Sequence, residues 1–221
     1  VVLYASINGH KVIYSHDGKT WEIADVDLPN TIFTSIDTDG SIWVASGGPV
    51  DDIENGTTLL WSDNGINWES LGNDIFPDMC QVVKTNGTMW IAVGRIADSN
   101  EGYVRGRIAH STDSKTWTVV EELTNYYNVV STSIDWSGNQ WLLMFGDGLY
   151  SSVDGITWRR LIQFDSGVTV LGYFPRAIRW SGSQWLIVGS THFFLTGGDS
   201  YLSSSVDGVT WFNALLEDVY Y

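Results

Sequence analysis

One seven-residue segment occurs five times in this chain of 221 residues and constrains its fold more than any other feature. Each copy starts with Ser, carries Asp or Asn at its third position and ends with Trp. The copies read SHDGKTW from Ser15, SDNGINW from Ser62, STDSKTW from Ser111, SVDGITW from Ser152 and SVDGVTW from Ser205. Their closing Trp residues lie about 40 to 55 residues apart, a period typical of repeat architectures. We call this segment the box.

Each box predicts a β-hairpin, because short β-prone runs such as Gly148-Leu149-Tyr150 precede it and further apolar residues follow it. The Asp or Asn can accept main-chain N–H bonds within its own turn, and the following Gly supplies a positive φ. The Trp is expected to pack as a buried plate against the next hairpin. The expected structural residues are Asp17, Trp21, Asn64, Trp68, Asp113, Trp117, Asp154, Trp158, Asp207 and Trp211. Ser114 replaces the Gly in the third box and predicts a different turn type there.

A second signature, Gly-x-x-Trp, recurs between the boxes and begins at Gly40, Gly87, Gly138 and Gly182. A short apolar run such as Ser35-Ile36 precedes each Gly, so we expect a second hairpin in every repeat. Four antiparallel strands every 40 to 50 residues or so are the pattern of a β-propeller blade. The sequence therefore predicts an all-β fold, with one propeller domain over residues 1–221. The expected blades span approximately residues 1–29, 30–75, 76–125, 126–168 and 169–221.

The boxes resemble the Asp-box, or bacterial neuraminidase repeat, of one family of β-propellers. The family pattern is Ser-x-Asp-x-Gly-x-Thr-Trp, and the box here is one residue shorter. The short box, together with the Trp-Ser-Gly-x-Gln-Trp-Leu hairpin that begins at Trp136 and again at Trp180, is also similar to repeat proteins of large DNA viruses and phage tails. The resemblance covers nearly the whole chain. It implies the propeller fold, with the box as a structural turn in enzymes and binding proteins alike.

The first blade is expected to lack its innermost strand, because residues 1–6 align with Ser41–Ser46 and thus with the second strand of a blade. Two explanations remain open. The C-terminal segment Glu217–Tyr221 supplies the strand and closes a five-blade ring, or the chain is part of a longer propeller. An open ring would leave sheet edges unpaired, so we favour a fragment or processed form.

Composition argues against several classes of partner and cofactor. Lys and Arg number 11 against 26 Asp and Glu, for a net charge of −15, and no basic patch is visible for nucleic acid. No apolar run is long enough to span a bilayer, so we expect no membrane insertion. The four His residues show no metal-ligand spacing, and Asp37-Thr38-Asp39-Gly40 lacks the remaining ligands of a calcium loop. Cys80 is the single Cys, and it has no surrounding nucleophile signature. We therefore expect no metal and no cofactor.

The connections that join the hairpins differ from repeat to repeat, whereas the turns within the hairpins are constant. A constant rim opposite a variable rim predicts that specificity lies on the variable one. The expected binding residues there are Asp51, Asp52, Glu54, Tyr103, Arg105, Tyr126, Tyr127, Tyr173, His192 and Phe193. Aromatic residues at these positions could stack on a sugar or anchor a protein partner. The alternative is that Tyr126, Tyr127 and Phe193 cap the blades as core.

Charged residues of alternating sign occupy the position three residues before each hairpin Gly. They are Asp37, Lys84, Asp135 and Arg179. Equivalent positions on successive inner strands should face one another near the propeller axis, so we expect a ring of ion pairs. Such a ring either neutralises crowded polar groups or lines a charged pocket.

Two functions of different classes follow from these patterns. The first is a non-catalytic recognition or structural module, with no catalytic residue, that binds a glycan or a protein through its variable rim in an extracellular or virion assembly. The alternative, which the shared box implies, is a sialidase-like glycoside hydrolase that uses Asp37 and Asp135 as its carboxylate pair. The segment Phe174-Pro175-Arg176 does not match the Arg-Ile-Pro motif of sialidases. The sequence does not indicate an oligomeric state.

Overall fold

The computed structural model describes residues 3–7, 11–26, 28, 31–50, 56–97, 104–126, 132–146, 148–163, 174–190 and 200–216. The chain divides into two compact units, Val1–Asn125 and Tyr126–Tyr221, and each is described by itself. The described residues form strands β1 to β19. None of them belongs to a helix that is long and apolar enough to cross a membrane.

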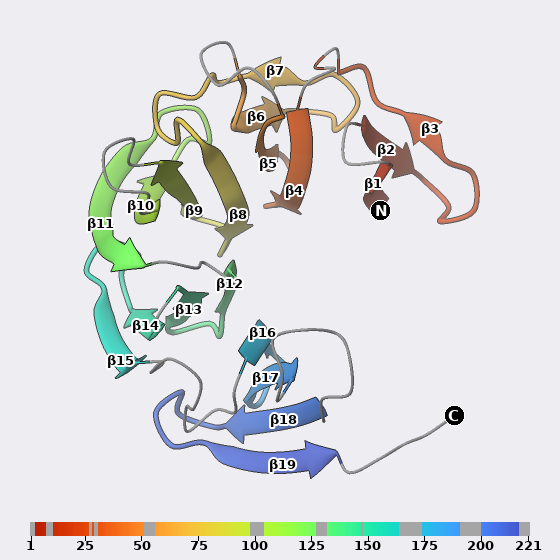
Figure 1. Ribbon diagram of the computed structural model, residues 1–221. Helices are drawn as coiled ribbons and strands as arrows, with labels where there is room; N and C mark the ends of the chain where they lie inside the picture. Colours follow the sequence, from red (N-terminus) through yellow and green to blue (C-terminus); the bar gives the residue numbers. More distant parts are fainter. Residues whose placement is uncertain are drawn as a thin grey trace. The chain divides into compact units, whose positions relative to one another are not determined.

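The first unit contains three sheets, each built from strands that follow one another in the chain (Figure 1). The first sheet consists of β1 (Leu3–Ile7), β2 (Lys11–Ser15) and β3 (Glu22–Ile23). The second consists of β4 (Thr31–Thr38), β5 (Trp43–Pro49), β6 (Leu59–Ser62) and β7 (Glu69–Ser70). The third consists of β8 (Met79–Thr85), β9 (Trp90–Ala97), β10 (Val104–Ser111) and β11 (Thr118–Tyr126).

The second unit contains two sheets of the same pattern. One consists of β12 (Thr132–Trp136), β13 (Trp141–Phe145), β14 (Gly148–Ser152) and β15 (Arg159–Gln163). The other consists of β16 (Phe174–Trp180), β17 (Trp185–Ser190), β18 (Ser200–Ser205) and β19 (Phe212–Leu216).

The box hairpin is confirmed in all five repeats, and the Gly-x-x-Trp hairpin is confirmed in the four repeats that carry that signature. The Gly-x-x-Trp turns connect the first and second strands, as in the antiparallel pair of β12 and β13, where Asp135 lies opposite Leu142. The boxes connect the last two strands of each sheet. Within the described residues the first sheet has three strands, as expected. Residues 217–221 lie outside the described part, so the proposed closure by the C-terminal segment stays open.

The box turn is held by its own side chains, as the fourth box shows. The Ser152 hydroxyl accepts the Gly155 N–H at 2.8 Å, and the Asp154 carboxylate accepts the N–H groups of Ile156 and Thr157 at 2.9 and 2.7 Å. The Trp158 indole N–H then donates to the Gly155 carbonyl at 3.1 Å. In the second box, Asn64 accepts the two equivalent N–H groups at 2.8 and 2.9 Å. A neutral amide oxygen therefore replaces the carboxylate without changing the turn.

The expectation of a different turn type at Ser114 is wrong. Ser114 has φ +66°, close to the +72° of Gly155, and the Trp117 indole donates to its carbonyl as in the other boxes. A non-glycine residue in this left-handed region is disfavoured. The Ser114 hydroxyl donates to the Asp113 carbonyl, and the side chain is buried. Contacts of the surrounding turn therefore hold the serine in the conformation that glycine adopts elsewhere.

The box Trp residues are not buried equally, which corrects the expectation of five equivalent plates. Trp117 and Trp158 are buried, but Trp21 is 40% exposed. Three of the four Trp residues of the other signature are more deeply enclosed, since Trp90 is 3% exposed and Trp141 and Trp185 are 0% exposed, whereas Trp43 is half-buried. The Gly-x-x-Trp hairpins thus contribute more to the core than the sequence indicates.

The core lies between neighbouring sheets of each unit. In the first unit, Tyr14 of the first sheet packs in one cluster with Phe33 and Leu60 of the second. In the second unit, Leu142 and Trp185 belong to one cluster that spans both of its sheets. Sheets that pack face to face through apolar side chains are the arrangement of successive propeller blades.

The box turns predict a specific pH dependence of stability. The main-chain N–H groups of Thr157 and Ile156 lower the pKa of Asp154 to about 2 from an ordinary 3.8, and the equivalent bonds lower the pKa values of Asp17, Asp113 and Asp207 to about 2. A carboxyl whose pKa is lower in the folded state stabilises above its unfolded-state value, and this stabilisation is lost as the pH falls towards 2. We expect the free energy of unfolding to decline from about pH 4 to pH 2.

Urea denaturation across this pH range checks the prediction. The variant Asp154→Asn should fold, because Asn64 already serves in the second box. Its free energy of unfolding should also decline less steeply than that of the wild type as the pH is lowered. An unchanged decline after the double substitution Asp154→Asn and Asp207→Asn would contradict the assignment.

Candidate functional site

The inner strand β4 is joined to the next sheet by two polar side chains. The Ser35 hydroxyl accepts the Val83 N–H at 3.4 Å and donates to the Val83 carbonyl at 3.3 Å. Two residues later, the Asp37 carboxylate accepts the Thr85 N–H at 2.8 Å. Both side chains therefore bind the main chain of β8, the inner strand of the neighbouring sheet.

The same arrangement occurs in the second unit between β12 and β16. The Ser133 hydroxyl accepts the Ile178 N–H at 3.1 Å, and the Asp135 carboxylate accepts the Trp180 N–H at 2.9 Å. Asp135 is only 9% exposed. The Ser and Asp of the motif Ser-Ile-Asp thus join two adjacent sheets in each unit. We call these two residues the inner-strand clamp.

The predicted charge ring is described only within each unit. In the first unit, the Lys84 ammonium lies 3.6 Å from the Asp37 carboxylate. In the second, the Arg179 guanidinium donates to the Ser133 hydroxyl at 3.0 Å and to the Ile178 carbonyl at 2.7 Å. A link between Lys84 and Asp135 would join the two units, so a closed ring stays a prediction.

Most of the predicted rim lies outside the described residues: Asp51, Asp52, Glu54, Tyr103, Tyr127, Tyr173, His192 and Phe193. Arg105 lies on β10 and is partly buried. Tyr126 is the last residue of β11. The rim as a binding surface therefore remains a prediction.

The described residues offer no metal centre and no activated thiol. No group of three His, Cys, Asp or Glu side chains among them could hold a metal ion. The Asp39 carboxylate, part of the calcium-like segment, accepts the N–H groups of Ser41 and Ile42 at 2.8 Å and so caps its own hairpin turn. Cys80 is fully buried, and burial raises the pKa of its thiol well above the usual range. Such a thiol is unsuited to nucleophilic chemistry.

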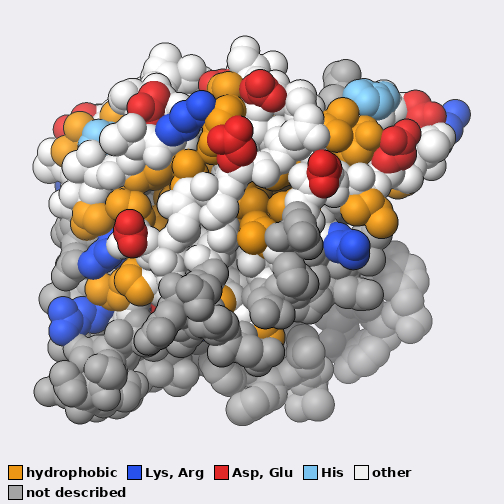
Figure 2. Space-filling view, turned by 90° about the horizontal axis from the view of Figure 1, so that it is seen from above, with side chains coloured by type: hydrophobic (Ala, Val, Ile, Leu, Met, Phe, Trp, Pro, Cys, Tyr) orange, Lys and Arg blue, Asp and Glu red, His pale blue; other side chains and the backbone are white. Residues whose placement is uncertain are grey.

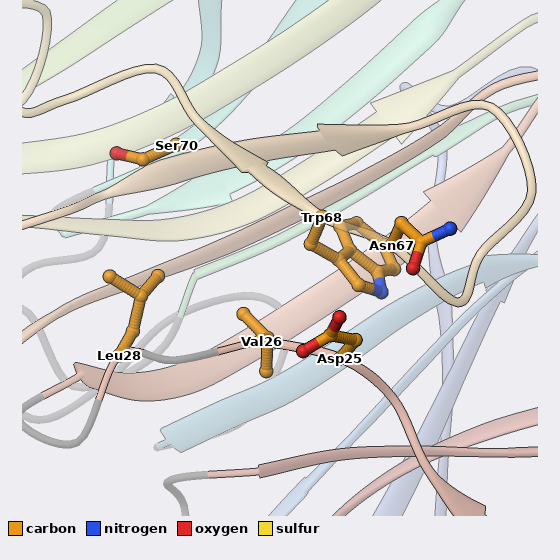
Figure 3. Close-up of a pocket in the computed structure, with 6 residues that line it drawn as sticks. All are labelled: Asp25, Val26, Leu28, Asn67, Trp68 and Ser70. Carbon is orange, nitrogen blue, oxygen red and sulfur yellow. The ribbon is translucent and has the colours of Figure 1, made fainter.

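A cavity of about 350 Å³ lies where the first and second sheets of the first unit meet (Figure 3). Its lining residues come from the segment that follows β3 and from the second box with β7: Asp25, Val26, Leu28, Asn67, Trp68 and Ser70. Figure 3 shows the Asp25 carboxylate and the Asn67 amide beside the Trp68 indole. We call this cavity the Asp25–Trp68 pocket.

Main-chain bonds fix both sides of the pocket. The Asp25 N–H donates to the Ile66 carbonyl at 2.8 Å, and the Trp68 N–H donates to the Asp25 carbonyl at 3.3 Å. Asp25 and Asn67 thereby form a parallel β-bridge between the two sheets. The Ser70 hydroxyl is held by Thr57 at 2.7 Å. The pocket is therefore preformed by the backbone.

The pocket occurs where the second box departs from the other four. The residue before the closing Trp is Thr in those boxes, whereas it is Asn67 here. The residue four positions after the box Trp is Asp25 in the first repeat, but Ile162 in the fourth. Ile162 packs in an apolar cluster with Trp211, the box Trp of the following sheet. The space that is filled by apolar packing in the second unit thus holds a carboxylate and an amide in the first.

The side chains of Asp25 and Asn67 can form further hydrogen bonds with a ligand. Neither the Asp25 carboxylate nor the Asn67 amide bonds to another described residue, and both are exposed. The carboxylate can accept hydroxyl protons, the amide can both donate and accept, and an indole face packs against apolar C–H groups. Together these groups match the mixed polar and apolar surface of a sugar ring.

Sequence reasoning missed this pocket, although a signal for it was present. Asn67 is the one departure from Thr among five equivalent box positions. A repeat that deviates from its own consensus towards a polar residue whose side chain bonds to no other described residue marks a candidate functional site. That Asp25 meets Asn67 follows only from the bridge between the two sheets.

Comparison with known proteins gives matches at the level of fold. No protein-family model matches the chain, and no curated protein matches it either. A thermostable family-43 glycoside hydrolase is similar with a TM-score of 0.52 and 12% identity, over 98% of this chain and 89% of that one. A provisionally assigned glycosidase from Bacteroides thetaiotaomicron has a TM-score of 0.51 and 12% identity, over 86% and 73%.

A GH32 β-fructofuranosidase from Bombyx mori matches with a TM-score of 0.48 and 13% identity, and this chain spans 60% of that structure's length. The structures with TM-scores above 0.5 are β-propellers, and at 12% identity they show the fold alone. Together with the five successive sheets of antiparallel strands, they establish that this chain has the β-propeller fold, built from four-stranded blades.

Proposed function

We propose that this protein is a carbohydrate-recognition β-propeller that holds a sugar ring in the Asp25–Trp68 pocket. The observation that carries the proposal is the convergence, in a preformed cavity, of an indole with a carboxylate and an amide that bond to no other described residue. Small-molecule sites typically have volumes of about 300–1,000 Å³, so this cavity suits one or two sugar rings. The family-43 glycoside hydrolase, which shares the fold, supports a glycan as the ligand.

Three finer assignments belong to the same proposal. The boxes are of the Asp-box type, with the turn described above as their structural role. The variable rim extends recognition beyond the pocket to further sugars of the same glycan. An extracellular or virion-associated location would give such a module access to glycans.

The substitution Asn67→Thr tests the proposal, because it restores the residue found in the other four boxes and should leave the turn intact. We expect it to weaken glycan binding about three- to tenfold, since a neutral hydrogen bond contributes about 0.5–1.5 kcal/mol. Asp25→Ala should weaken binding about ten- to a hundredfold, because bonds to a charged group contribute about 1.5–3 kcal/mol. A glycan array followed by calorimetry on the bound glycans measures both effects.

The matched control is Thr210→Asn in the fifth box, which makes the opposite exchange away from the pocket. It should leave the affinity unchanged. Retention of full affinity in both Asn67→Thr and Asp25→Ala would overturn the pocket assignment.

Glycoside hydrolysis is the second candidate, and the shared fold of the family-43 hydrolase favours it. Its candidate carboxylates, Asp37 and Asp135, each accept a main-chain N–H from the next sheet. That engagement supports a structural role for both. Chromogenic glycosides test this candidate. Turnover by the wild type that is lost in Asp135→Asn, with glycan binding retained, would establish hydrolysis and contradict a role in recognition alone.

A further inference from the structure

We infer that the Asp25–Trp68 pocket selects uncharged sugars and rejects sugars that carry a carboxylate, such as sialic or uronic acids. The inference rests on the proposed function and adds the chemical class of its ligand. It follows from the charge of the lining residues, from the way Asp25 is held and from the charge of the chain as a whole.

Asp25 is the only charged residue among the described residues that line the pocket. The others are Val26, Leu28, Asn67, Trp68 and Ser70, and none of them supplies a positive charge. Proteins usually bind a ligand carboxylate through Arg or Lys, which neutralise it and donate to both of its oxygens. The pocket instead presents a carboxylate of its own, so an anionic sugar would meet an uncompensated like charge.

Asp25 cannot easily move away from a ligand carboxylate, because its backbone is fixed. Its N–H and its carbonyl are both bonded to the second box, at 2.8 Å to Ile66 and 3.3 Å to Trp68. The backbone that carries the carboxylate is therefore fixed on the pocket wall. A ligand carboxylate close to Asp25 must either be repelled or force rotation of the side chain away from the hydroxyl groups that it would otherwise accept.

The rest of the chain reinforces this selection. Its net charge is −15, and Figure 2 shows acidic side chains scattered across the described part of one face rather than gathered in a single patch. Two like charges about 4 Å apart near a protein surface repel by more than the energy of a tenfold change in affinity. Anionic sugars are thus expected to bind at least about tenfold more weakly than neutral sugars of the same shape.

The test compares three forms of each glycan on the array: the neutral oligosaccharide, its sialylated form, and the sialylated form with the carboxyl group methyl-esterified. The ester keeps the shape of sialic acid but removes its charge. We expect the wild type to bind the neutral and esterified forms and to bind the sialylated form at least about tenfold more weakly. Added salt should narrow this gap, because it screens the repulsion.

The variant Asp25→Asn separates charge from shape, and it should fold because the Asp25 side chain bonds to no described residue. It should lose most of the wild type's preference for the esterified form over the sialylated form. The control Asp63→Asn removes an exposed carboxylate of the second box that does not line the pocket, and it should keep the wild-type preference.

Equal or tighter binding of the sialylated forms by the wild type would overturn the inference and leave the proposed function standing. Equal rejection of the sialylated and esterified forms would assign the selectivity to shape and would also overturn it. Binding of no glycan in any form would overturn the proposed function, and this inference with it.

Discussion

Trp185→Ala is expected to lower the free energy of unfolding by about 3–5 kcal/mol, the largest effect of any single substitution considered. Trp185 is 0% exposed and lies in the cluster that joins both sheets of the second unit. It also packs edge-on against Trp180, with 5.2 Å between the ring centroids. Truncation to Ala would leave a cavity between the two sheets, and urea denaturation would measure its cost.

Two control variants sharpen this test. Trp185→Phe should lower the free energy of unfolding by less than about half as much as Trp185→Ala, since it keeps an aromatic ring in place. The Trp185 indole N–H has no hydrogen-bond partner among the described residues, so the Phe variant loses no bond to that part of the chain. Trp21→Ala should also cost less, because Trp21 is 40% exposed. A loss at Trp21 as large as that at Trp185 would contradict the view that the Gly-x-x-Trp hairpins dominate the core.

Asp135→Ala is expected to lower the free energy of unfolding by about 1–3 kcal/mol, because it leaves the Trp180 N–H without its acceptor at a site that is nearly closed to water. Asp135→Asn keeps an acceptor oxygen and should cost less. Thermal and urea denaturation of the two variants measure the difference. If the two variants lower the free energy of unfolding equally, or if neither lowers it, Asp135 is not a clamp between β12 and β16.

The local structure of the repeats could be predicted from sequence because it depends on neighbouring residues. Ser152, Asp154 and Gly155 make their turn within one hairpin, and their spacing already specifies the bonds. The wrong expectation at Ser114 has the same origin. A serine disfavours a left-handed φ in isolation, but the rest of the box and the Trp117 indole bond favour it.

The contacts between sheets could not be predicted in the same way. That Ser35 and Asp37 bind the main chain of β8, rather than only other side chains, depends on how two successive sheets approach each other. The exposure of Trp21 depends on how much of its ring the neighbouring sheet covers. The Asp25–Trp68 pocket needs a bridge between residues that lie 42 positions apart, at Asp25 and Asn67. No motif within one repeat specifies such a bridge.

The central claim, that a sugar binds against the Trp68 indole, can be tested most directly by NMR of the indole N–H groups during titration with a glycan that binds on the array. The indole signals can be assigned with single Trp→Phe variants. The account predicts that the Trp68 signal shifts with saturation, while those of Trp158 and Trp211, which occupy the same box position in the second unit, stay fixed. A saturating shift at Trp158 or Trp211 with no change at Trp68 would contradict it.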